Sequence, residues 1–418
     1  MIKRDRGAPH STYFSDLQAE LRDRGPGKPV LLLDMDALDA NIEVVKRRVA
    51  PGLAVRVVAK SLASIPLLRR ILDRLGTRRI MVFDDTLGAI ARALPDADIL
   101  IGKPMPVRAA ARFYEEGQRA DREDSGSVGT ASPSGEHSGG RARVRWLVDG
   151  ADRLAQYASL GRRLGITIRV CVEVDVGLHR GGVSDVSELL ALMKAIAEDP
   201  AHLAFAGLMG YEAHVASAPP LISSLQSAFD ASVARLVAAK QAVIEQYPRL
   251  CEGDVVWNAG GSKTYSLYSS EGPASEVALG SCLVKPTDFD VPTLVEHVPA
   301  AFIAAPVLKR LAGVRVPFLE GASRAWAALD PNRAVTYFLY GGGWLAKPVS
   351  PEGLSDNPLY GFSTNQAMLN GSERTGLHPD DWVFFRPTQS ERVLQEFGAL
   401  QAVEKRKLTG LLEALPFS

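Results

Sequence analysis

The stretch Val55-Arg56-Val57-Val58-Ala59-Lys60-Ser61-Leu62 is the one from which the fold and the function of this chain are best approached. Its β-favouring residues predict a strand, which ends in a lysine just before a turn that begins a helix. A lysine at the end of a buried apolar strand is unusual, because burial disfavours the charged ammonium. The strand alone leaves two interpretations of Lys60 open: a packed stem whose head reaches water, or a neutral amine that reacts with a carbonyl group.

Strands and helices alternate on both sides of this stretch, as in a parallel α/β domain. About eight strand–helix units fit between Val30 and Gly280, which is the number that closes a (β/α)8 TIM-type barrel. From about Thr293 onwards, short β-like runs are separated by Gly- and Pro-rich turns, and these predict a C-terminal antiparallel β domain. The expected barrel strands are 29–34, 55–59, 80–83, 98–101, 144–148, 166–174, 203–211 and 254–257.

Three regions follow from this pattern. We expect an N-terminal segment at 1–28 that packs with the β domain, a barrel at 29–290 and the β domain at 291–418. Residues 117–143 are rich in Gly, Ser and charge and almost free of apolar residues, so they predict a flexible surface insertion. We interpret them as a tolerated loop within the barrel, because the strand–helix alternation resumes beyond them. A functional lid is the less favoured alternative.

Composition excludes several classes of protein. Lysine plus arginine and aspartate plus glutamate both number 48, so no overall field attracts nucleic acid or an anionic membrane. No run approaches the roughly 18 apolar residues of a membrane span, and 1–27 has no apolar core of a signal peptide. The three cysteines are far apart, which is typical of a reducing compartment. We therefore expect a cytoplasmic protein without nucleic-acid or membrane partners.

Chemically capable residues recur where the expected barrel strands end. Because the active site of a parallel barrel lies at the C-terminal ends of its strands, we expect these residues to converge. The Gly-Gly-Ser-Lys-Thr loop at 260–264 has the backbone freedom and the hydroxyls of a phosphate cradle, although it lacks the GxxxxGK[ST] spacing of a nucleotide P-loop. Each signal alone is weak, since Gly-Gly-Ser is also a plain turn and a lone histidine is usually structural. The candidates are Lys60, His179, Arg180, Tyr211, His214, Asn258, Gly260, Gly261 and Ser262.

Three stretches carry a resemblance to a known family. They are Arg56-x-x-Ala59-Lys60-Ser61, Val172-Glu173-Val174-Asp175-Val176-Gly177-x-His179-Arg180-x-Gly182-Val183 and Gly207-x-x-x-Tyr211-x-x-His214. They resemble the signature stretches of the pyridoxal-phosphate enzymes of the alanine-racemase fold type (fold type III). The resemblance is greatest to the D-threonine aldolase and D-serine dehydratase branch. It covers most of 29–288, and weaker matches at 275–281 and 341–343 extend it into the β domain.

The resemblance implies pyridoxal 5′-phosphate as the cofactor and gives roles to individual residues. Lys60 would form the internal aldimine, and Lys60 and His214 would be the catalytic residues. Arg180 would hydrogen-bond the phenolic oxygen, and His214 would lie against the pyridine ring. The phosphate would be held by Gly260, Gly261 and Ser262, helped by the backbone near Gly280 and Ser281. His179, Tyr211 and Asn258 are also expected at the cofactor.

Two departures from the family pattern bear on the reaction. Ala278 stands where alanine racemases have the arginine that pairs with the pyridine nitrogen, which disfavours a racemase. In the aldolase and dehydratase branch, a Pro-x-His-x-Cys/Asp motif binds a divalent metal. Here the corresponding stretch is Pro387-Thr388-Gln389-Ser390-Glu391. Gln389 and Glu391 form a poor zinc pair, but they suit Ca²⁺ or Mg²⁺. There are two alternatives: Glu391 acts as a base without a metal, or Gln389 and Glu391 are ordinary polar surface residues.

The sequence thus predicts a pyridoxal-phosphate-dependent lyase that acts on a β-hydroxy D-amino acid, by aldol cleavage or by dehydration. An amino-acid racemase of the same fold and a non-catalytic cofactor-binding barrel remain the alternatives. The resemblance also implies a homodimer, in which the β domain of one subunit closes over the barrel of the other.

Overall fold

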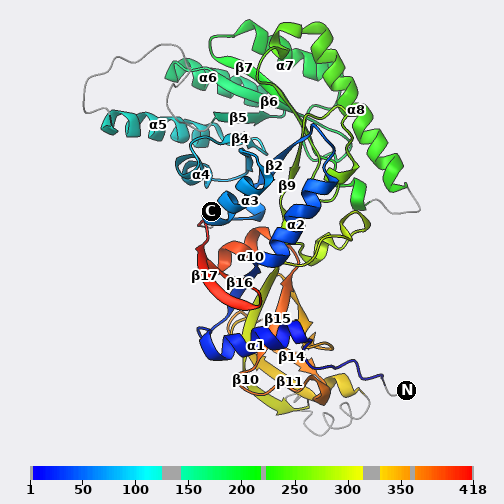
Figure 1. The fold of residues 1–418 in the computed structure, drawn as a ribbon. Coiled ribbons are helices and arrows are strands. Elements are labelled where there is room, and N and C mark those ends of the chain that lie inside the picture. The colour runs from blue at the N-terminus through cyan, green and yellow to red at the C-terminus, as the bar shows by residue number, and fades with distance from the viewer. Residues whose placement is uncertain (1–2, 125–142, 218–222, 314–329, 358–362, 417–418) are drawn as a thin grey trace, which may run out of the picture. The chain divides into compact units, whose positions relative to one another are not determined.

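The computed structural model describes residues 3–124, 143–217, 223–313, 330–357 and 363–416. The chain divides into two compact units (Figure 1). The barrel unit consists of Val44–Gly280 with Val291–Thr293, and the sheet unit consists of Met1–Glu43, Ser281–Asp290 and Leu294–Phe417.

Eight parallel strands close a barrel in chain order. They are β2 (Ala54–Val58), β3 (Arg79–Val82), β4 (Asp98–Ile101), β5 (Arg143–Val148), β6 (Ile168–Val174), β7 (Leu203–Gly210), β8 (Val256–Ala259) and β9 (Glu276–Leu279). The (β/α)8 TIM-type barrel is therefore confirmed.

The first strand of the barrel is not the one expected from the sequence. Strand β1 (Val30–Asp34) pairs antiparallel with β10 (Ala301–Ala312) and parallel with β16 (Ala399–Glu404) in the sheet unit. The eighth place in the barrel is taken by β9, which pairs with both β2 and β8. An uninterrupted apolar run predicts a strand buried on both faces, but it does not say to which sheet the strand belongs.

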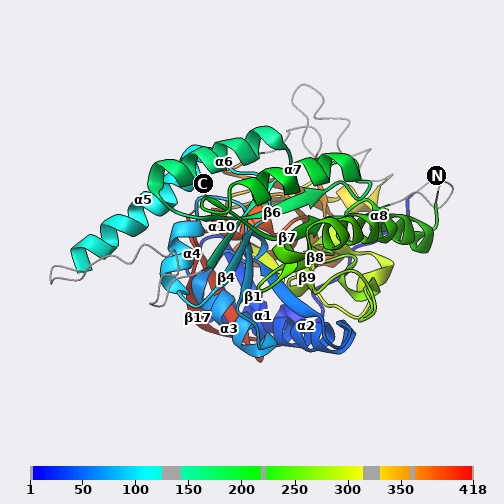
Figure 2. The ribbon, with the colours of Figure 1, turned by 90° about the horizontal axis from the view of Figure 1, so that it is seen from above.

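Helices connect the barrel strands, and Figure 2 shows α6, α7 and α8 outside the strands they follow. Helix α3 shows why these segments are helical. Its apolar residues at 67, 68, 71 and 72 are buried on one face, and the left-handed Gly76 ends it. The helices are α2 (Met35–Arg48), which leads from β1 to the barrel, α3 (Ile65–Leu75), α4 (Leu87–Ala93), α5 (Val107–Asp124), α6 (Ala151–Leu164), α7 (Val186–Glu198) and α8 (Leu225–Gln246).

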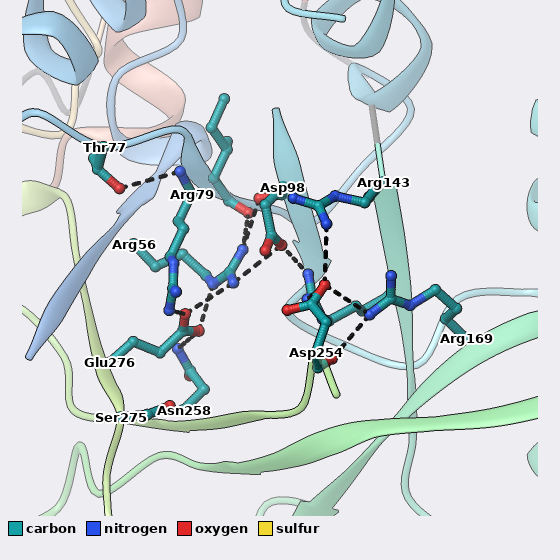
Figure 3. Close-up of polar contacts among 12 residues, drawn as sticks. Arg56, Thr77, Arg79, Asp98, Arg143, Arg169, Asp254, Asn258, Ser275 and Glu276 are labelled. Carbon is teal, nitrogen blue, oxygen red and sulfur yellow. Dashed lines mark hydrogen bonds and ion pairs between the residues drawn. The ribbon is translucent and has the colours of Figure 1, made fainter. Parts of the chain in front are cut away.

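The N-terminal ends of the barrel strands enclose an ionic network (Figure 3). The guanidinium of Arg56, which is fully buried, donates to both carboxylate oxygens of Glu276 at 2.5 and 2.9 Å and to Asp98 at 3.2 Å. Arg145, also fully buried, pairs with Asp98 from the other side. This network joins β2, β4, β5 and β9 at the end of the barrel opposite the strand termini that carry the candidate residues.

An apolar layer follows the ionic one along the strands. Because side chains alternate along a strand, Arg56 and Val58 both face the interior. Lys60 is two residues further along, just beyond the end of the strand. Val58 packs on this layer. The buried members of the layer are Met81, Leu100, Leu147, Cys171, Ala206, Met209, Val256 and Ala278.

In its described residues the sheet unit contains a predominantly antiparallel sheet of nine strands, of which β1 and β16 pair in parallel. Helix α1 (Thr12–Arg24) lies on one face through Leu17 and Leu21, which pack with Phe302, Trp382 and Phe384. The remaining elements are β11 (Val335–Leu339), β12 (Ala346–Ser350), β13 (Ser355–Asp356), β14 (Met368–Gly371), β15 (Trp382–Pro387), α10 (Glu391–Glu396) and β17 (Lys407–Glu413).

The expected insertion at 117–143 begins later than the sequence indicates. Helix α5 continues to Asp124, so the first part of that stretch is helical. Residues 125–142 lie outside the described residues. Among the helices that the structure describes, none combines the length and the apolar character of a membrane span.

Candidate functional site

Lys60 lies in a single 3-10 turn, Ala59–Ser61, that directly continues strand β2. The turn is closed by a hydrogen bond from the amide of Leu62 to the carbonyl of Ala59 at 2.9 Å. Lys60 is half-buried, and its Nζ lies 4.5 Å from the ring centroid of Phe83, which follows β3. The buried turn fixes the lysine at the C-terminal rim of the barrel, where its amine faces an aromatic ring.

Gly280 joins the Lys60 turn to the glycine loop. Its amide donates to Ser262 Oγ at 3.0 Å. A β-carbon at Gly280 would lie 2.8 Å from the carbonyl oxygen of Val58 and 3.0 Å from Cβ of Ser61, on either side of Lys60. Only a glycine lets the end of β9 approach the end of β2 this closely.

Tyr211 and Arg180 continue the same rim. A β-carbon on Gly261 would lie 2.8 Å from Cε2 of Tyr211, so the glycine leaves room for the ring. The guanidinium of Arg180 lies 4.9 Å from the centroid of that ring and 3.9 Å from Glu173 Oε1. Burial raises the pKa of Glu173, although Arg180 acts in the opposite direction.

His214 follows Tyr211 and reaches towards α8. Its Nε2 lies 3.4 Å from Ser232 Oγ, and Gly177 leaves the ring space on another side. Its Nδ1 is buried, and among the described residues it has no hydrogen-bond partner. Because burial lowers the pKa of His214, the ring is neutral at neutral pH. The orphaned Nδ1 is therefore an available polar atom in the site.

The glycine loop is held from behind by residues that the sequence did not point out. Gly260, with φ of +81°, donates its N–H to Glu212 Oε2 at 3.4 Å. Gly261 donates its N–H to Thr264 Oγ1 at 3.0 Å. Both amides, which we expected to face a phosphate, are thus turned towards Glu212 and Thr264. The group of this loop region that can still donate to a ligand is the hydroxyl of Ser262, whose oxygen accepts the amide of Gly280.

Two candidate residues of the barrel unit are engaged elsewhere. Asn258 is buried and donates to Glu276 Oε1 at 2.8 Å, within the ionic network (Figure 3). His179 is largely exposed, and its Nδ1 lies 2.7 Å from Asp175. Asp175 also accepts the amides of Gly177 and His179, so it shapes this loop.

The other three candidates belong to the sheet unit. Ser281 follows Gly280 and is buried, and its hydroxyl receives a hydrogen bond from Ser390 at 3.2 Å. The carboxamide of Gln389 donates to Asp288 at 3.2 Å, and Glu391 begins helix α10. In the part of the chain that the structure describes, no group of three or more His, Cys, Asp or Glu side chains is arranged to hold a metal ion.

Sequence reasoning missed Phe83 and Glu212, and it assigned the hydroxyl of Thr264 to a phosphate, whereas this hydroxyl donates to Glu212. A weak signal existed for Glu212, since an acid directly after a buried strand is as unusual as the lysine after β2. Nothing in the sequence pairs Glu212 with the glycine loop, because its partners lie about 50 residues further along the chain.

The donor set of the barrel rim fits pyridoxal 5′-phosphate. An amine (Lys60) suits an aldehyde, and a guanidinium (Arg180) suits a phenolic oxygen. The hydroxyl of Ser262, held by the Gly280 amide, suits a phosphate. The orphaned Nδ1 of His214 adds a polar contact. All five residues belong to the barrel unit.

The comparisons with known proteins identify the class to which this fold and site belong. The family model described as "Alanine racemase, N-terminal domain" matches residues 33–287, which is more than half of the chain. The chain therefore belongs to this family of pyridoxal-phosphate proteins of fold type III.

The sequence identity to individual known proteins is low. The chain is 28% identical over 195 residues to the curated D-threonine aldolase from Arthrobacter sp., and the match covers 46% of this chain and 49% of that protein. It thus spans about half the length of the curated relative.

Solved structures share the fold over nearly the whole chain. D-threo-3-hydroxyaspartate dehydratase from Delftia sp. HT23 is 18% identical with a TM-score of 0.66, covering 93% of this chain and 98% of that one. D-threonine aldolase from Filomicrobium marinum is 16% identical with a TM-score of 0.65 over 93% and 97%. Alanine racemase from Bacillus anthracis is 13% identical with a TM-score of 0.65 over 92% and 97%. At these identities the likeness shows the fold alone.

Proposed function

We propose that the protein is a pyridoxal-phosphate-dependent lyase that acts on a β-hydroxy D-amino acid. The observation that carries this proposal is the continuous rim from the Lys60 turn through Gly280 to Ser262, in a member of the alanine racemase N-terminal domain family. An amine and a hydroxyl that could bind an anion thus lie at one end of a closed barrel. The curated D-threonine aldolase supports the choice of reaction class.

Each residue of the rim has a defined task in this proposal. Lys60 Nζ would hold the cofactor through its aldehyde group and would carry protons to and from the substrate Cα. Arg180, which lies over the Tyr211 ring, would hold the phenolic oxygen, and the hydroxyl of Ser262, held by the Gly280 amide, would hold the phosphate. His214, neutral because burial lowers its pKa, offers Nδ1 as a polar contact. When bound, the cofactor delocalises the electron pair left at Cα by bond cleavage.

Ala278 supports a lyase over a racemase. Its side chain is buried in the apolar layer of the barrel with Met81 and Leu100. A racemase of the resembling type has an arginine at this position, which would introduce a charge there. The methyl group of Ala278 cannot provide the positive charge that pairs with the pyridine nitrogen in those racemases.

The group that activates the β-hydroxyl remains a prediction. We assign it to Gln389 and Glu391. A divalent cation such as Ca²⁺ or Mg²⁺, bound by these two residues, is an additional element that the experiment below tests. Asp288, which lies about 100 residues earlier in the chain and accepts a hydrogen bond from Gln389, supplies a further oxygen beside it. One related dehydratase was solved in a form described as metal-free, so dependence on a metal is a direct question for this chain too.

Absorbance of the purified protein tests the role of Lys60. After reconstitution with pyridoxal 5′-phosphate, the wild type is expected to show an imine band that borohydride removes. Lys60→Ala is expected to show only free cofactor. Lys103→Ala is the matched control, because this exposed lysine also follows a barrel strand and should keep the band. A wild type without the band contradicts the proposal.

The reaction is tested with D-threonine, D-serine and D-3-hydroxyaspartate, before and after treatment with a chelator. Aldehyde release indicates an aldolase, and release of ammonia with a keto acid indicates a dehydratase. Loss of both after chelation, restored by Mg²⁺ or Ca²⁺, indicates the metal. Interconversion of D- and L-alanine with neither product would favour the racemase alternative.

A further inference from the structure

A buried carboxylate lies directly behind the glycine loop. Glu212 follows β7 and is 1% exposed. It accepts the amide of Gly260 and the hydroxyl of Thr264, and that hydroxyl accepts the amide of Gly261. Glu212 therefore holds two consecutive amides of the loop, one directly and one through Thr264.

This carboxylate is held by hydrogen bonds to uncharged groups. Among the described residues, no lysine, arginine or histidine forms an ion pair with Glu212. The titratable group that faces it is the phenol of Tyr268, which donates a further hydrogen bond and packs on Phe229 of α8. The charged or titratable groups of the adjoining segments are Lys263 in the loop and His214. Burial raises the pKa of Glu212 despite its hydrogen bonds, and it also raises that of Tyr268.

The hydrogen bonds around Glu212 can be satisfied in both protonation states. When the carboxyl is ionised, Thr264 donates its hydroxyl to Glu212. When the carboxyl is protonated, it can donate to Thr264 Oγ1 instead. The Thr264 hydroxyl then turns to the carbonyl oxygen of Gly261, which is 3.5 Å away. The loop amides keep their partners in either arrangement.

We propose that Glu212 is a positioning residue that takes up a proton when a phosphate group binds beside the loop at Ser262 and Gly280. This inference rests on the proposed function, because the phosphate is taken to be that of the cofactor. An ionised carboxylate without a cation repels a phosphate dianion through the low-dielectric loop, whereas the neutral acid holds the same amides without repulsion. By linkage, the proton and the phosphate strengthen each other's binding.

The direction of the pH dependence follows. The pKa of Glu212 is raised in the free protein, and a bound dianion raises it further. Affinity for the phosphate is therefore greatest below the raised pKa and falls as pH rises through it, at the limit by about tenfold per pH unit. Above the pKa of the complex the affinity levels off.

The ratio of two dissociation constants isolates this effect. 5-Deoxypyridoxal lacks the phosphate and cannot close to a hemiacetal, so its aldehyde reacts with Lys60 as that of pyridoxal 5′-phosphate does. The ratio of the two constants therefore cancels the protonation of the lysine. It is measured between about pH 6.5 and 9, above the second ionisation of the phosphate near 6. We call the factor by which the phosphate strengthens binding, given by this ratio, the phosphate advantage. In the wild type, the phosphate advantage is expected to fall with increasing pH.

Two variants separate proton uptake from a merely structural role. Glu212→Gln mimics the neutral acid, because its oxygen can accept from Gly260 and its nitrogen can donate to Thr264. We expect it to keep the phosphate advantage at every pH, at the level of the wild type at low pH. Glu212→Ala removes both anchors and should lose the advantage throughout. The proposal is overturned if Glu212→Gln shows the wild-type slope, if it behaves like Glu212→Ala, or if the wild type has no slope.

Calorimetry with sulfate keeps this test independent of the cofactor. Sulfate is a dianion over the whole range, and the buffer dependence of its binding heat reports protons taken up. We expect uptake approaching one proton in the wild type and none in Glu212→Gln; equal uptake in both overturns the inference. A missing imine band with sulfate-linked uptake intact refutes the proposed function alone. A normal band with no difference in uptake refutes only this inference.

Discussion

Gly280 is the residue at which the amine and the phosphate-binding parts of the site meet. In Gly280→Ala the added β-carbon would lie 2.8 Å from a backbone oxygen of Val58, which cannot rotate away. We expect a loss of about 1–3 kcal/mol in unfolding free energy from overpacking. Affinity for pyridoxal 5′-phosphate should fall as well, because the Gly280 amide moves away from Ser262. Denaturant unfolding and cofactor titration measure the two effects.

Gly410→Ala, an exposed position in strand β17, is the matched control for this substitution. A β-carbon there has no neighbouring atom within 4 Å, and the residue does not require a left-handed conformation. It should leave both quantities unchanged. Wild-type cofactor affinity in Gly280→Ala would show that the contact between the ends of β9 and β2 does not shape the site.

At this scale the sequence predicts which residues follow a barrel strand, but not what their side chains contact. Lys60, Arg180, Tyr211 and Ser262 share one rim, whereas Asn258 donates its amide to the ionic network. The periodicity of a strand gives the face on which a side chain lies. The partner that captures a hydrogen bond depends on other strands, and a single sequence does not place those strands.

Among the elements, the pair of Arg56 and Glu276 connects the two strands whose ends carry Lys60 and Gly280. Glu276→Gln would leave the buried guanidinium of Arg56 with Asp98 as its carboxylate partner, and Asp98 is shared with Arg145. Breaking a buried pair in this way costs about 3–5 kcal/mol in unfolding free energy. Asp73→Asn is the control, because its pair with Arg78 is exposed and should contribute no more than about 1 kcal/mol. Equal losses in the two variants would contradict a structural role for the network.

The same pair predicts how stability depends on pH. Burial would raise the pKa of Glu276, but Arg56 and further hydrogen bonds hold it below its usual value. A carboxyl with a lowered pKa stabilises the fold above its unfolded pKa, near 4.5, and this contribution is lost as pH falls through the folded value. Unfolding free energy should therefore decline below about pH 4.5. Glu276→Gln should show a shallower decline, and an identical slope would show that other carboxyls account for it.

Strands β1 and β9 show the limit of prediction at the level of elements. Both are short and buried, and both lie at the ends of the region in which strands and helices alternate. The sequence predicts the number of barrel strands because eight closes the barrel. It does not reveal that β1 pairs with β10 and β16, strands that lie more than 250 residues away.

For the whole molecule we propose a homodimer, as the resemblance to the family implies. In the sheet unit, several large apolar side chains are exposed, among them Val295 at 75% and Leu345 at 52%. Exposed apolar side chains are typical of surfaces that another subunit covers. Light scattering should give twice the chain mass of 45.0 kDa. Leu345→Asp should shift the protein towards the monomer, whereas Ile244→Asp, an exposed position on α8 of the barrel unit, should not. A wild-type monomer would contradict this proposal.

The sequence by itself determined that this chain forms a (β/α)8 barrel with a separate β domain, because the period of its apolar residues reports local structure and burial. It also placed a lysine, an arginine and a glycine loop at strand ends. The tertiary structure decided which strand opens the barrel, which glycine joins the Lys60 turn to Ser262, and that Glu212 holds the loop from behind. These features depend on hydrogen bonds and close approaches between distant segments. Local sequence patterns therefore leave them open, and packing selects among the alternatives.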